Sequence, residues 1–327
     1  MSKQNVLFIS PEFFGIEKSL ISAMENYGYN VSWYDERSIR SSFARALNSV
    51  SNMFFCFQSD KYYQRIIESI DTQVDIILIV KGDMVSKNTI DLLRKRFPNA
   101  ELILYLWDPV RNIKGILPKL KYYDRIISFE PKDCKEYGFE FRALFCDIEK
   151  VINYSHKESV YDVSFYGTMY GDRFRIVHLM NEFCKLHNKR FYSFCFLRGK
   201  FMNLFYYLTN SGYRMLGSKA ISYRPKSSRE IAEIIKSTKV VLDINDIHQE
   251  GLTIRTLETI ANGKKIITTN SDIMNYDFYN QNNIFVIDRD NVDIPEDFFQ
   301  SDYEPIPENI LEKYTAQGWV KDVFKKS

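Results

Sequence analysis

Residues Asp243 to Thr269 read DINDIHQEGLTIRTLETIANGKKIITT. We interpret this stretch as the end of a strand over Lys239–Ile244, a loop, a helix over Thr253–Asn262 and a strand over Lys265–Thr269. Gly263 ends the predicted helix, because glycine often follows the last helical residue. In proteins that alternate strands and helices in this way, ligands bind at the carboxyl ends of the strands of the sheet. The loop and the first turn of the helix are therefore the first place to look for a site.

This loop and helix carry residue types that suit a phosphate and a sugar. Glu250 and Glu258 stand eight positions apart, the first in the loop and the second about a turn and a half inside the helix. Gly251 lets the backbone approach a ligand closely, and the helix N-terminus offers free N–H groups to a phosphate. Arg255 adds a fork of donors for phosphate oxygens, while the Glu258 carboxylate can accept hydrogen bonds from both hydroxyls of a ribose. The alternative is that both glutamates are solvated charges beside an ordinary helix.

The rest of the chain alternates strands and helices in two halves. We predict further strands over Val6–Ser10, Asn30–Tyr34, Asp75–Val80, Glu101–Leu106, Arg125–Ser128, Tyr161–Gly167, Arg190–Phe196 and Ile284–Ile287. Helices are predicted over 16–27, Lys87–Phe97, Arg173–Cys184 and Ser228–Ser237, the last opening with a serine cap. This rhythm predicts the α/β class, with parallel sheets covered on both faces. We expect two domains, 1–150 and 151–327, that join in the polar stretch Glu149–Val160, with a C-terminal tail free to cross back to the first.

Composition excludes several classes of protein. The 327 residues are 45% apolar and 26% charged with a formal net charge of +2, which excludes a largely disordered chain and names no partner by charge. The five cysteines are scattered without a CxxC pair, so neither a zinc ribbon nor a disulfide framework is predicted. The N-terminus does not resemble a secretory signal, and the run Ile76–Val80 is far too short to cross a bilayer. We expect a cytoplasmic protein, at most peripheral on the inner face of the cytoplasmic membrane.

The motif EGLTxRxxExxAxG over residues 250–263 resembles the donor-site signature of GT-B glycosyltransferases. The arginine three residues before the second glutamate is most similar to the CgeB-like branch, whereas Lys264-Lys265 departs from the small apolar pair common after the glycine. The resemblance implies GT-B architecture, in which two Rossmann-like domains with parallel sheets face a cleft. It also implies that the N-terminal domain binds the acceptor and the C-terminal domain binds a nucleotide sugar, with no cofactor and no essential metal.

The resemblance assigns roles to residues of the second domain. Glu258 would bind the ribose, Arg255 and the amides of 251–253 would bind the diphosphate, and Glu250 would face the donor sugar as a catalytic residue.

A second candidate segment, residues 165–173, follows a predicted strand. Its two glycines can bring backbone amides to a phosphate and Arg173 can add charge, unless Arg173 pairs with its neighbour Asp172. The predicted donor-binding residues are Glu258, Arg255, Gly251, Leu252, Thr253, Gly167, Thr168, Arg173 and His248. His248 is included because it precedes Glu250 by two residues; an ordinary loop histidine is the alternative.

Loops after the predicted strands of the first half supply the acceptor-side candidates. The predicted acceptor-side residues are Gly15, Lys81, Asp83 and Arg111. If the reaction inverts the anomeric carbon, one carboxylate would take the proton of the acceptor hydroxyl, and we predict Asp108 first and Glu12 second as that catalytic base. Each of these carboxylates has the alternative role of stabilising a turn. The histidines lack metal-ligand spacing, so no metal site is predicted.

Basic and aromatic residues gather between Glu182 and Glu230. This segment contains ten Lys or Arg and no acidic residue, interleaved with Phe and Tyr. Such a segment suits the surface of an anionic membrane through residues 185–229, and it also suits single-stranded nucleic acid, whose bases stack on rings. The remaining alternative is that the aromatics are core and the charges balance the acidic stretch Asp288–Glu312. We expect no nucleic-acid partner and leave membrane and core open.

The sequence therefore predicts a glycosyltransferase that moves a sugar from a nucleotide sugar to a glycan or lipid-linked acceptor. The resemblance places it in the synthesis of bacterial surface polysaccharide or lipopolysaccharide and favours retention at the anomeric carbon. Arg255, Arg173 and helix N–H groups would stabilise the departing diphosphate. Two alternatives stay open: a GT-B-type sugar-nucleotide epimerase, and a non-catalytic sugar-nucleotide-binding assembly protein.

Overall fold

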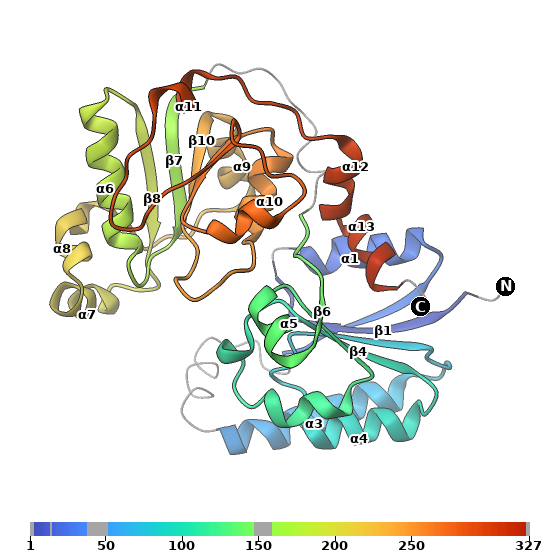
Figure 1. Ribbon diagram of the computed structural model, residues 1–327. Helices are drawn as coiled ribbons and strands as arrows, with labels where there is room; N and C mark the ends of the chain where they lie inside the picture. Colours follow the sequence, from blue (N-terminus) through green and yellow to red (C-terminus); the bar gives the residue numbers. More distant parts are fainter. Residues whose placement is uncertain (1–2, 14, 38–51, 147–158, 325–327) are drawn as a thin grey trace. The chain divides into compact units, whose positions relative to one another are not determined.

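The computed structural model describes residues 3–13, 15–37, 52–146 and 159–324 (Figure 1). The chain divides into two compact units, of which the first comprises Met1–Leu144 with Thr315–Ser327 and the second comprises Phe145–Tyr314. Most of the predicted boundary stretch, Glu149–Val160, lies outside the described residues.

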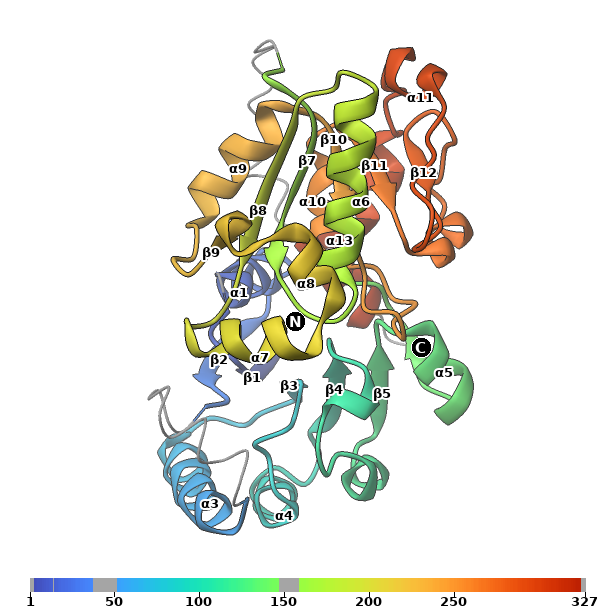
Figure 2. The ribbon, with the colours of Figure 1, turned by 90° about the vertical axis from the view of Figure 1, so that its left-hand side faces the viewer.

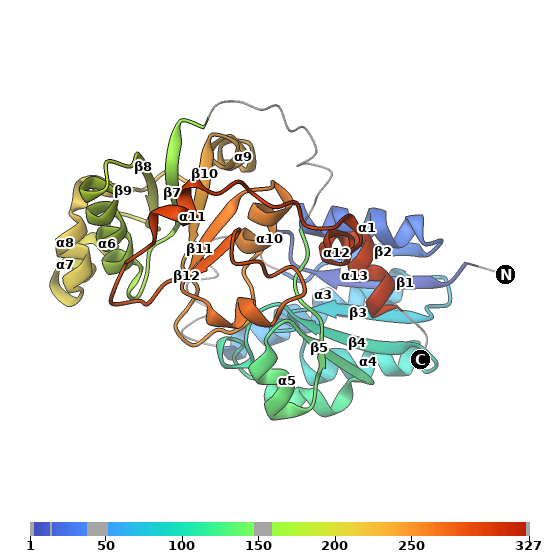
Figure 3. The ribbon, with the colours of Figure 1, turned by 45° about the horizontal axis from the view of Figure 1, so that its top comes forward.

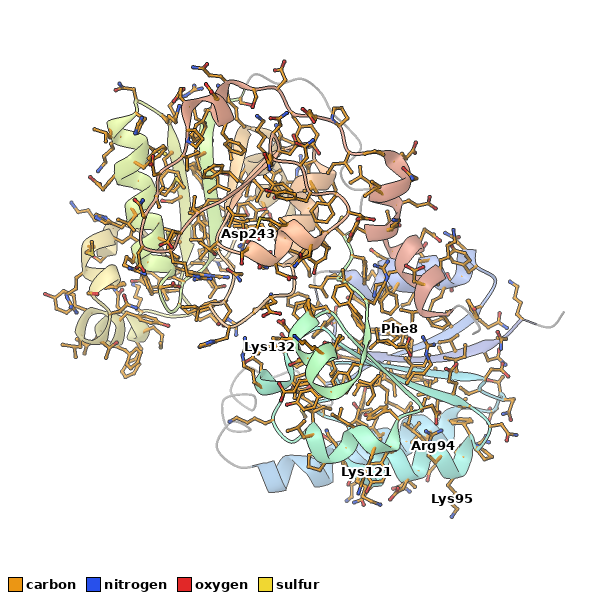
Figure 4. The ribbon with its side chains drawn as sticks, viewed as in Figure 1. Phe8, Arg94, Lys95, Lys121, Lys132 and Asp243 are labelled. Atoms are coloured by element: carbon orange, nitrogen blue, oxygen red, sulfur yellow. The ribbon has the colours of Figure 1, made fainter. Side chains whose placement is uncertain are left out.

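The first unit is built on a six-stranded parallel sheet in the order β2-β1-β3-β4-β5-β6. Its strands are β1 (Asn5–Ser10), β2 (Asn30–Asp35), β3 (Ile76–Val80), β4 (Glu101–Leu106), β5 (Arg125–Ser128) and β6 (Glu140–Phe141). Its helices are α1 (Ile16–Asn26), α3 (Asn52–Ser69), α4 (Lys87–Arg96), α5 (Pro131–Tyr137) and α13 (Ala316–Val323), with short 3-10 helices η1 (Val110–Asn112) and η2 (Leu117–Tyr122). All of β3 is buried, as is Phe8 in β1 (Figure 4). Because helices cover both faces of the sheet, its strands carry unbroken apolar runs.

The last helix returns to the first unit. In α13, Trp319 is completely buried, and its ring meets the ring of Tyr105 edge-on at 4.8 Å between centroids. The helix lies beside α1 (Figure 1), and the Val323 carbonyl accepts a 2.8 Å hydrogen bond from Arg125. Residues from the two ends of the chain therefore share one core.

The second unit has a second six-stranded parallel sheet, in the order β12-β11-β10-β7-β8-β9 (Figure 3). Its strands are β7 (Tyr161–Thr168), β8 (Phe191–Phe196), β9 (Ile221–Ser222), β10 (Thr238–Asp243), β11 (Lys265–Thr268) and β12 (Ile284–Val286). Its helices are α6 (Arg173–Leu186), α7 (Phe201–Thr209), α8 (Ser211–Leu216), α9 (Ser228–Lys236), α10 (Ile254–Ala261), α11 (Glu296–Gln300) and α12 (Glu308–Leu311), with 3-10 helices η4 (Ser218–Ala220), η5 (Ser271–Asn275) and η6 (Glu312–Tyr314). The carboxyl ends of β7 and β10, which pair with one another, bring two loops together.

Every predicted strand is present, with ends that differ from the prediction by no more than one residue. The two-residue strands β6 and β9 were not predicted, because so short a segment has no periodicity. The cap of α9 is Ser227 rather than Ser228: the Ser227 side chain accepts the N–H of Glu230, whose carboxylate accepts the N–H of Ser227. Within the described ranges, no helix combines the length and the apolar character needed to cross a bilayer.

Candidate functional site

Asp243 is the last residue of β10 and organises the loop and helix that follow it (Figure 4). Its side chain is 1% exposed. One carboxylate oxygen accepts a 3.0 Å hydrogen bond from Nη1 of Arg255, and the other accepts the hydroxyls of Thr253 and Thr256. A single buried carboxylate thus ties the first turn of α10 to the end of the strand.

The loop before α10 is held by buried amide side chains. Asn245 donates from Nδ2 to the carbonyl of Gln249 at 2.6 Å, and Asn270 donates to the carbonyl of Glu250 at 2.8 Å. The Glu250 side chain itself is exposed, as predicted for a loop position. Its backbone is therefore fixed while its carboxylate faces solvent.

The residues after Glu250 lead into the helix N-terminus. Gly251 is buried, and Leu252 is 1% exposed, so its side chain packs inside the unit. Thr253 caps α10 by accepting the N–H of Thr256 at 3.2 Å. His248 is exposed, and its backbone N–H donates to Asp246.

Gly167 and Arg255, predicted from separate segments, lie against each other. A Cβ at Gly167 would stand 2.9 Å from Nη2 of Arg255, so any other residue there would require the guanidinium at the end of β7 to shift. That guanidinium also lies over the ring of Tyr166, 4.9 Å from its centroid. Burial lowers the pKa of Arg255, but Asp243 and other neighbours raise it more, so its pKa stands above the usual value. Arg255 is therefore a fixed cation whose buried Nε has no hydrogen-bond partner among the described residues.

Arg173 is a second arginine at the same edge of the sheet, and it is buried. It is 6% exposed and donates to the carbonyls of Thr168 at 2.8 Å and Ile244 at 2.5 Å. Burial, and after it the nearby charge of Arg255, lower the pKa of Arg173 to about 10. The alternative pairing with Asp172 is wrong, because that carboxylate accepts two hydrogen bonds from Arg289. Arg173 forms no ion pair with any described residue, so the site carries an excess of buried positive charge.

Glu258 lies close to these groups on α10. Glu258 is half-buried. The pKa of Tyr166 is raised mainly by the burial of Tyr166 itself and next by the negative charge of Glu258. The carboxyl edge thus presents two guanidiniums, a helix N-terminus and one half-buried carboxylate. This set can bind an anion flanked by a group with hydroxyls.

The departure at Lys264-Lys265 has a structural reason. Lys265 is 5% exposed, and its ammonium donates to the Phe298 carbonyl at 2.9 Å and to the Ser301 hydroxyl at 2.7 Å. Lys264 donates to the carbonyl of Lys236. These lysines tie β11 to its neighbours and lie outside the anion site.

In the first unit, three of the predicted residues form one charged cluster. Nζ of Lys81 lies 3.4 Å from a carboxylate oxygen of Asp83 and 3.4 Å from one of Asp108. Burial lowers the pKa of Lys81, yet the surrounding carboxylates raise it above its usual value, so this lysine stays protonated. Lys81 has a φ of 75°, which turns the chain sharply after β3.

The other acceptor-side candidates occupy separate positions. The backbone N–H of Glu12 donates to Asp35 at 3.4 Å, and Gly15 stands at the N-cap of α1 with a φ of 82°. Arg111 is exposed and lines a pocket of about 540 Å³ between residues 110–118 and α5. The ion pairs of Lys81 are made to Asp83 and Asp108, so the structure brings together only this part of the predicted set.

Sequence reasoning missed two buried acids, Asp243 as the hub of the donor loop and Glu36 after β2. Glu36 is completely buried; one oxygen accepts the N–H of Met84 at 3.2 Å, while the other has no hydrogen-bond partner among the described residues. Burial, and after it Asp83, raise its pKa well above the usual range. Asp243 is the last residue of β10 and Glu36 follows the last residue of β2, and that position at a strand end was the signal available in the sequence. In the described ranges, no group of three or more His, Cys, Asp or Glu is arranged to hold a metal ion.

Comparisons with known proteins bear on the fold. No family model matches the sequence, and no curated protein matches it. The structure is similar to an α-glucosyltransferase solved with UDP and a 13-mer DNA (TM-score 0.63, 14% identity, 99% of each chain). It is also similar to the lipopolysaccharide outer core galactosyltransferase WaaB (TM-score 0.54, 11% identity, 98% of this chain and 99% of that chain). A third match is HepE of Anabaena in complex with UDP and glucose (TM-score 0.58, 9% identity, 97% of this chain and 98% of that chain).

At sequence identities this low, the similarity shows the fold alone. Two six-stranded parallel sheets with their helices, matched over almost the whole chain, show that this protein has the GT-B fold of glycosyltransferases.

Proposed function

We propose that the protein is a glycosyltransferase whose second unit binds a nucleoside diphosphate sugar. The observation that carries the proposal is a pair of arginines beside the N-terminus of α10: Arg173, which is buried, and Arg255, whose side chain is 15% exposed. A buried cation that lacks a counter-ion is strongly unfavourable, and Arg173 forms no ion pair with a described residue. A diphosphate would neutralise this charge and accept the free N–H groups of α10.

The remaining residues of the site suit the other parts of such a donor. Glu258 lies half-buried in α10, where its carboxylate can accept both ribose hydroxyls. Gly167 leaves the space in which Arg255 stands. Glu250 is exposed on a rigid loop, where it can face the donor sugar. These roles follow the resemblance of residues 250–263 to the GT-B donor signature.

The transfer itself needs a stabilised leaving group. We propose a retaining reaction: the bond from the anomeric carbon to the diphosphate oxygen breaks, and the acceptor oxygen bonds to the same face of the sugar. The acceptor proton passes to the departing phosphate, whose charge Arg173, Arg255 and the α10 amides stabilise. The anomeric coupling constant of the product, measured by NMR, tests this; an inverted product would assign the proton to a base, and Asp108 is the first candidate.

The acceptor side is proposed to lie in the first unit. The Lys81, Asp83 and Asp108 cluster offers both donors and acceptors to the hydroxyls of a sugar. A glycan or a lipid-linked sugar has this chemistry, which is the acceptor class expected in surface polysaccharide or lipopolysaccharide synthesis.

A thermal-shift screen of the full chain tests the donor site. The ligands are UDP, GDP, CMP, ADP, TDP and their sugars. At a hundred times its dissociation constant, a ligand of the folded state stabilises by about 2.7 kcal/mol, or about 5–10 °C for a domain of this size. We expect one nucleotide to give such a shift, and we expect Glu258→Ala to abolish it. Glu233→Ala is the matched control, because Glu233 is an exposed glutamate on α9, outside the site.

The outcomes separate the proposal from its competitors. Release of the nucleoside diphosphate in the presence of an acceptor supports transfer. Binding with a change in the donor sugar but no release would favour an epimerase, and binding without any turnover would favour an assembly protein. No shift with any nucleotide would overturn the donor site.

A further inference from the structure

Helix α7 turns an apolar face to solvent. The side chains of Phe201, Leu204, Phe205 and Leu208 are 88%, 62%, 52% and 68% exposed. Their positions i, i+3, i+4 and i+7 place them on one side of the helix. Such a stripe normally faces the core of a protein, so its exposure on a surface helix calls for an occupant.

The opposite side of α7 already supplies its packing. The ring of Tyr206 lies 4.9 Å from that of Phe174 on α6, and Asn203 accepts the hydroxyl of the buried Tyr213. The alternative that the aromatics of this segment are core therefore holds for Tyr206 and Tyr213 but not for the outward face. Folding of the unit does not require that face.

Helix α7 is joined to a well-packed part of the second unit through α8 and Asn210. Helix α8 packs on α6 (Figure 2), and Gly212 makes this possible, since a Cβ there would stand 2.7 Å from the backbone N of Arg175. Asn210, between α7 and α8, donates to the carbonyl of Gly171 at 2.8 Å. The apolar face is thus held in place by contacts that do not use it.

Basic residues flank α7 in the chain, and one of them, Arg214, donates to the carbonyl of Tyr207 on α7. The side chains of Arg198, Lys200, Arg214 and Lys219 are exposed, and none forms an ion pair with a described residue. In the alternative interpretation the acidic stretch Asp288–Glu312 balances such charges; among the described residues its ion pair with the basic segment joins Glu296 to Lys189. No acidic residue stands between Glu182 and Glu230 to offset the rest.

We propose that α7 and its basic rim bind the surface of a bilayer that contains anionic lipid. Apolar side chains on one helix face enter the boundary between headgroups and acyl chains, to a depth of about 5–10 Å, while Lys and Arg around them contact anionic headgroups. Nucleic acid fits less well, because Leu204 and Leu208, which form half of the stripe, offer bases no ring on which to stack.

Vesicle co-sedimentation of the full chain tests this proposal. One set of vesicles contains phosphatidylglycerol and phosphatidylcholine at 30:70, and the other contains phosphatidylcholine alone. We expect binding to the anionic vesicles, weakened at about 1 M NaCl, where the Debye length falls to about 3 Å. The double variant Leu204→Gln with Leu208→Gln should bind about tenfold more weakly or worse. Leu186→Gln is the matched control, because Leu186 is 78% exposed at the end of α6 and lies outside the stripe.

Each result decides the matter. Circular dichroism and an unchanged melting temperature establish that the double variant is folded. Loss of binding in this variant and its retention in the control support the proposal. No binding of the wild type to anionic vesicles overturns it, as does equal weakening by both variants. A concentration-dependent dimer that the double variant dissolves, or binding to a single-stranded oligonucleotide in place of vesicles, would assign the face to another occupant. The assay needs no donor or acceptor, so it stands apart from the proposed transfer reaction.

Discussion

Asp243→Asn is the substitution that tests the architecture of the site most directly. The side chain is 1% exposed and holds Arg255 through one oxygen and two threonine hydroxyls through the other. Asparagine keeps the shape and one oxygen to accept from Arg255, and its amide can still meet the hydroxyls. What it removes is the negative charge, so the buried Arg173 and the partly buried Arg255 would lie together without this counter-ion.

The expected magnitude follows from that charge. Removing one partner of a buried ion pair costs about 3–5 kcal/mol. A loss of 1 kcal/mol lowers the melting temperature of a domain of about 150–250 residues by about 2–4 °C. The second unit should therefore melt about 6–20 °C lower in the variant.

The assay can assign the change to the second unit. All three tryptophans, Trp33, Trp107 and Trp319, belong to the first unit, so Trp fluorescence follows only that unit. Calorimetry and far-ultraviolet circular dichroism follow both. We expect the lowered transition to appear in calorimetry and circular dichroism while the Trp transition stays in place.

Asp162→Asn is the matched control. Asp162 stands near the amino end of β7 and pairs with Arg190 and Lys239, whose side chains are 59% and 53% exposed. Exposed pairs of this kind contribute about 0.2–1 kcal/mol, so the control should shift the melting temperature by no more than a few degrees. A change below about 1 kcal/mol in Asp243→Asn, or an equal change in both variants, would refute the reasoning about the buried charge.

Three further predictions test other parts of the chain. Gly167→Ala should lower the affinity for the bound nucleotide about tenfold in isothermal titration, because its Cβ would stand 2.9 Å from Nη2 of Arg255; a change below about twofold would contradict this. Glu36→Gln should raise the melting temperature at pH 8 by about 2–4 °C and leave it unchanged at pH 4. The reason is that burial and Asp83 raise the pKa of Glu36 in the folded protein. The wild type therefore loses stability as the pH rises from the pKa of about 4.3 in the unfolded chain towards the raised pKa in the folded protein. Equal gains in melting temperature at both pH values would exclude that titration. Trp319→Ala should cost about 3–5 kcal/mol in urea unfolding of the first unit, because the ring is fully buried against Tyr105, and a loss under about 1 kcal/mol would show that α13 is not part of that core.

The sequence was sufficient for the α/β rhythm and for one segment of the site. Strands such as β3 can be predicted from the sequence because a parallel strand covered on both faces is apolar at every position. The segment 250–263 was readable because a loop, a cap and a helix are built from residues close in the chain. Structures formed by residues close in the chain can be predicted from the sequence of that segment.

Only the tertiary structure decided which distant groups meet. The sequence left open whether Arg173 pairs with its neighbour Asp172; in the structure Arg173 donates to carbonyls at the ends of two strands, and Asp172 pairs with Arg289, 117 residues away. The return of α13 to the first unit likewise joins Trp319 to Tyr105. Such contacts depend on the order in which strands pair, and no periodicity along the chain records that order.

The same division holds for charge and exposure. The sequence by itself established that residues between Glu182 and Glu230 are basic and aromatic. It left open which rings are core, because α7 is apolar on both sides and its pattern does not say which side faces inward. The structure decides this through Tyr206, which packs on Phe174, and so leaves Phe201 and the two leucines in solvent. Burial is a property of the packed elements, and a sequence pattern can only propose it.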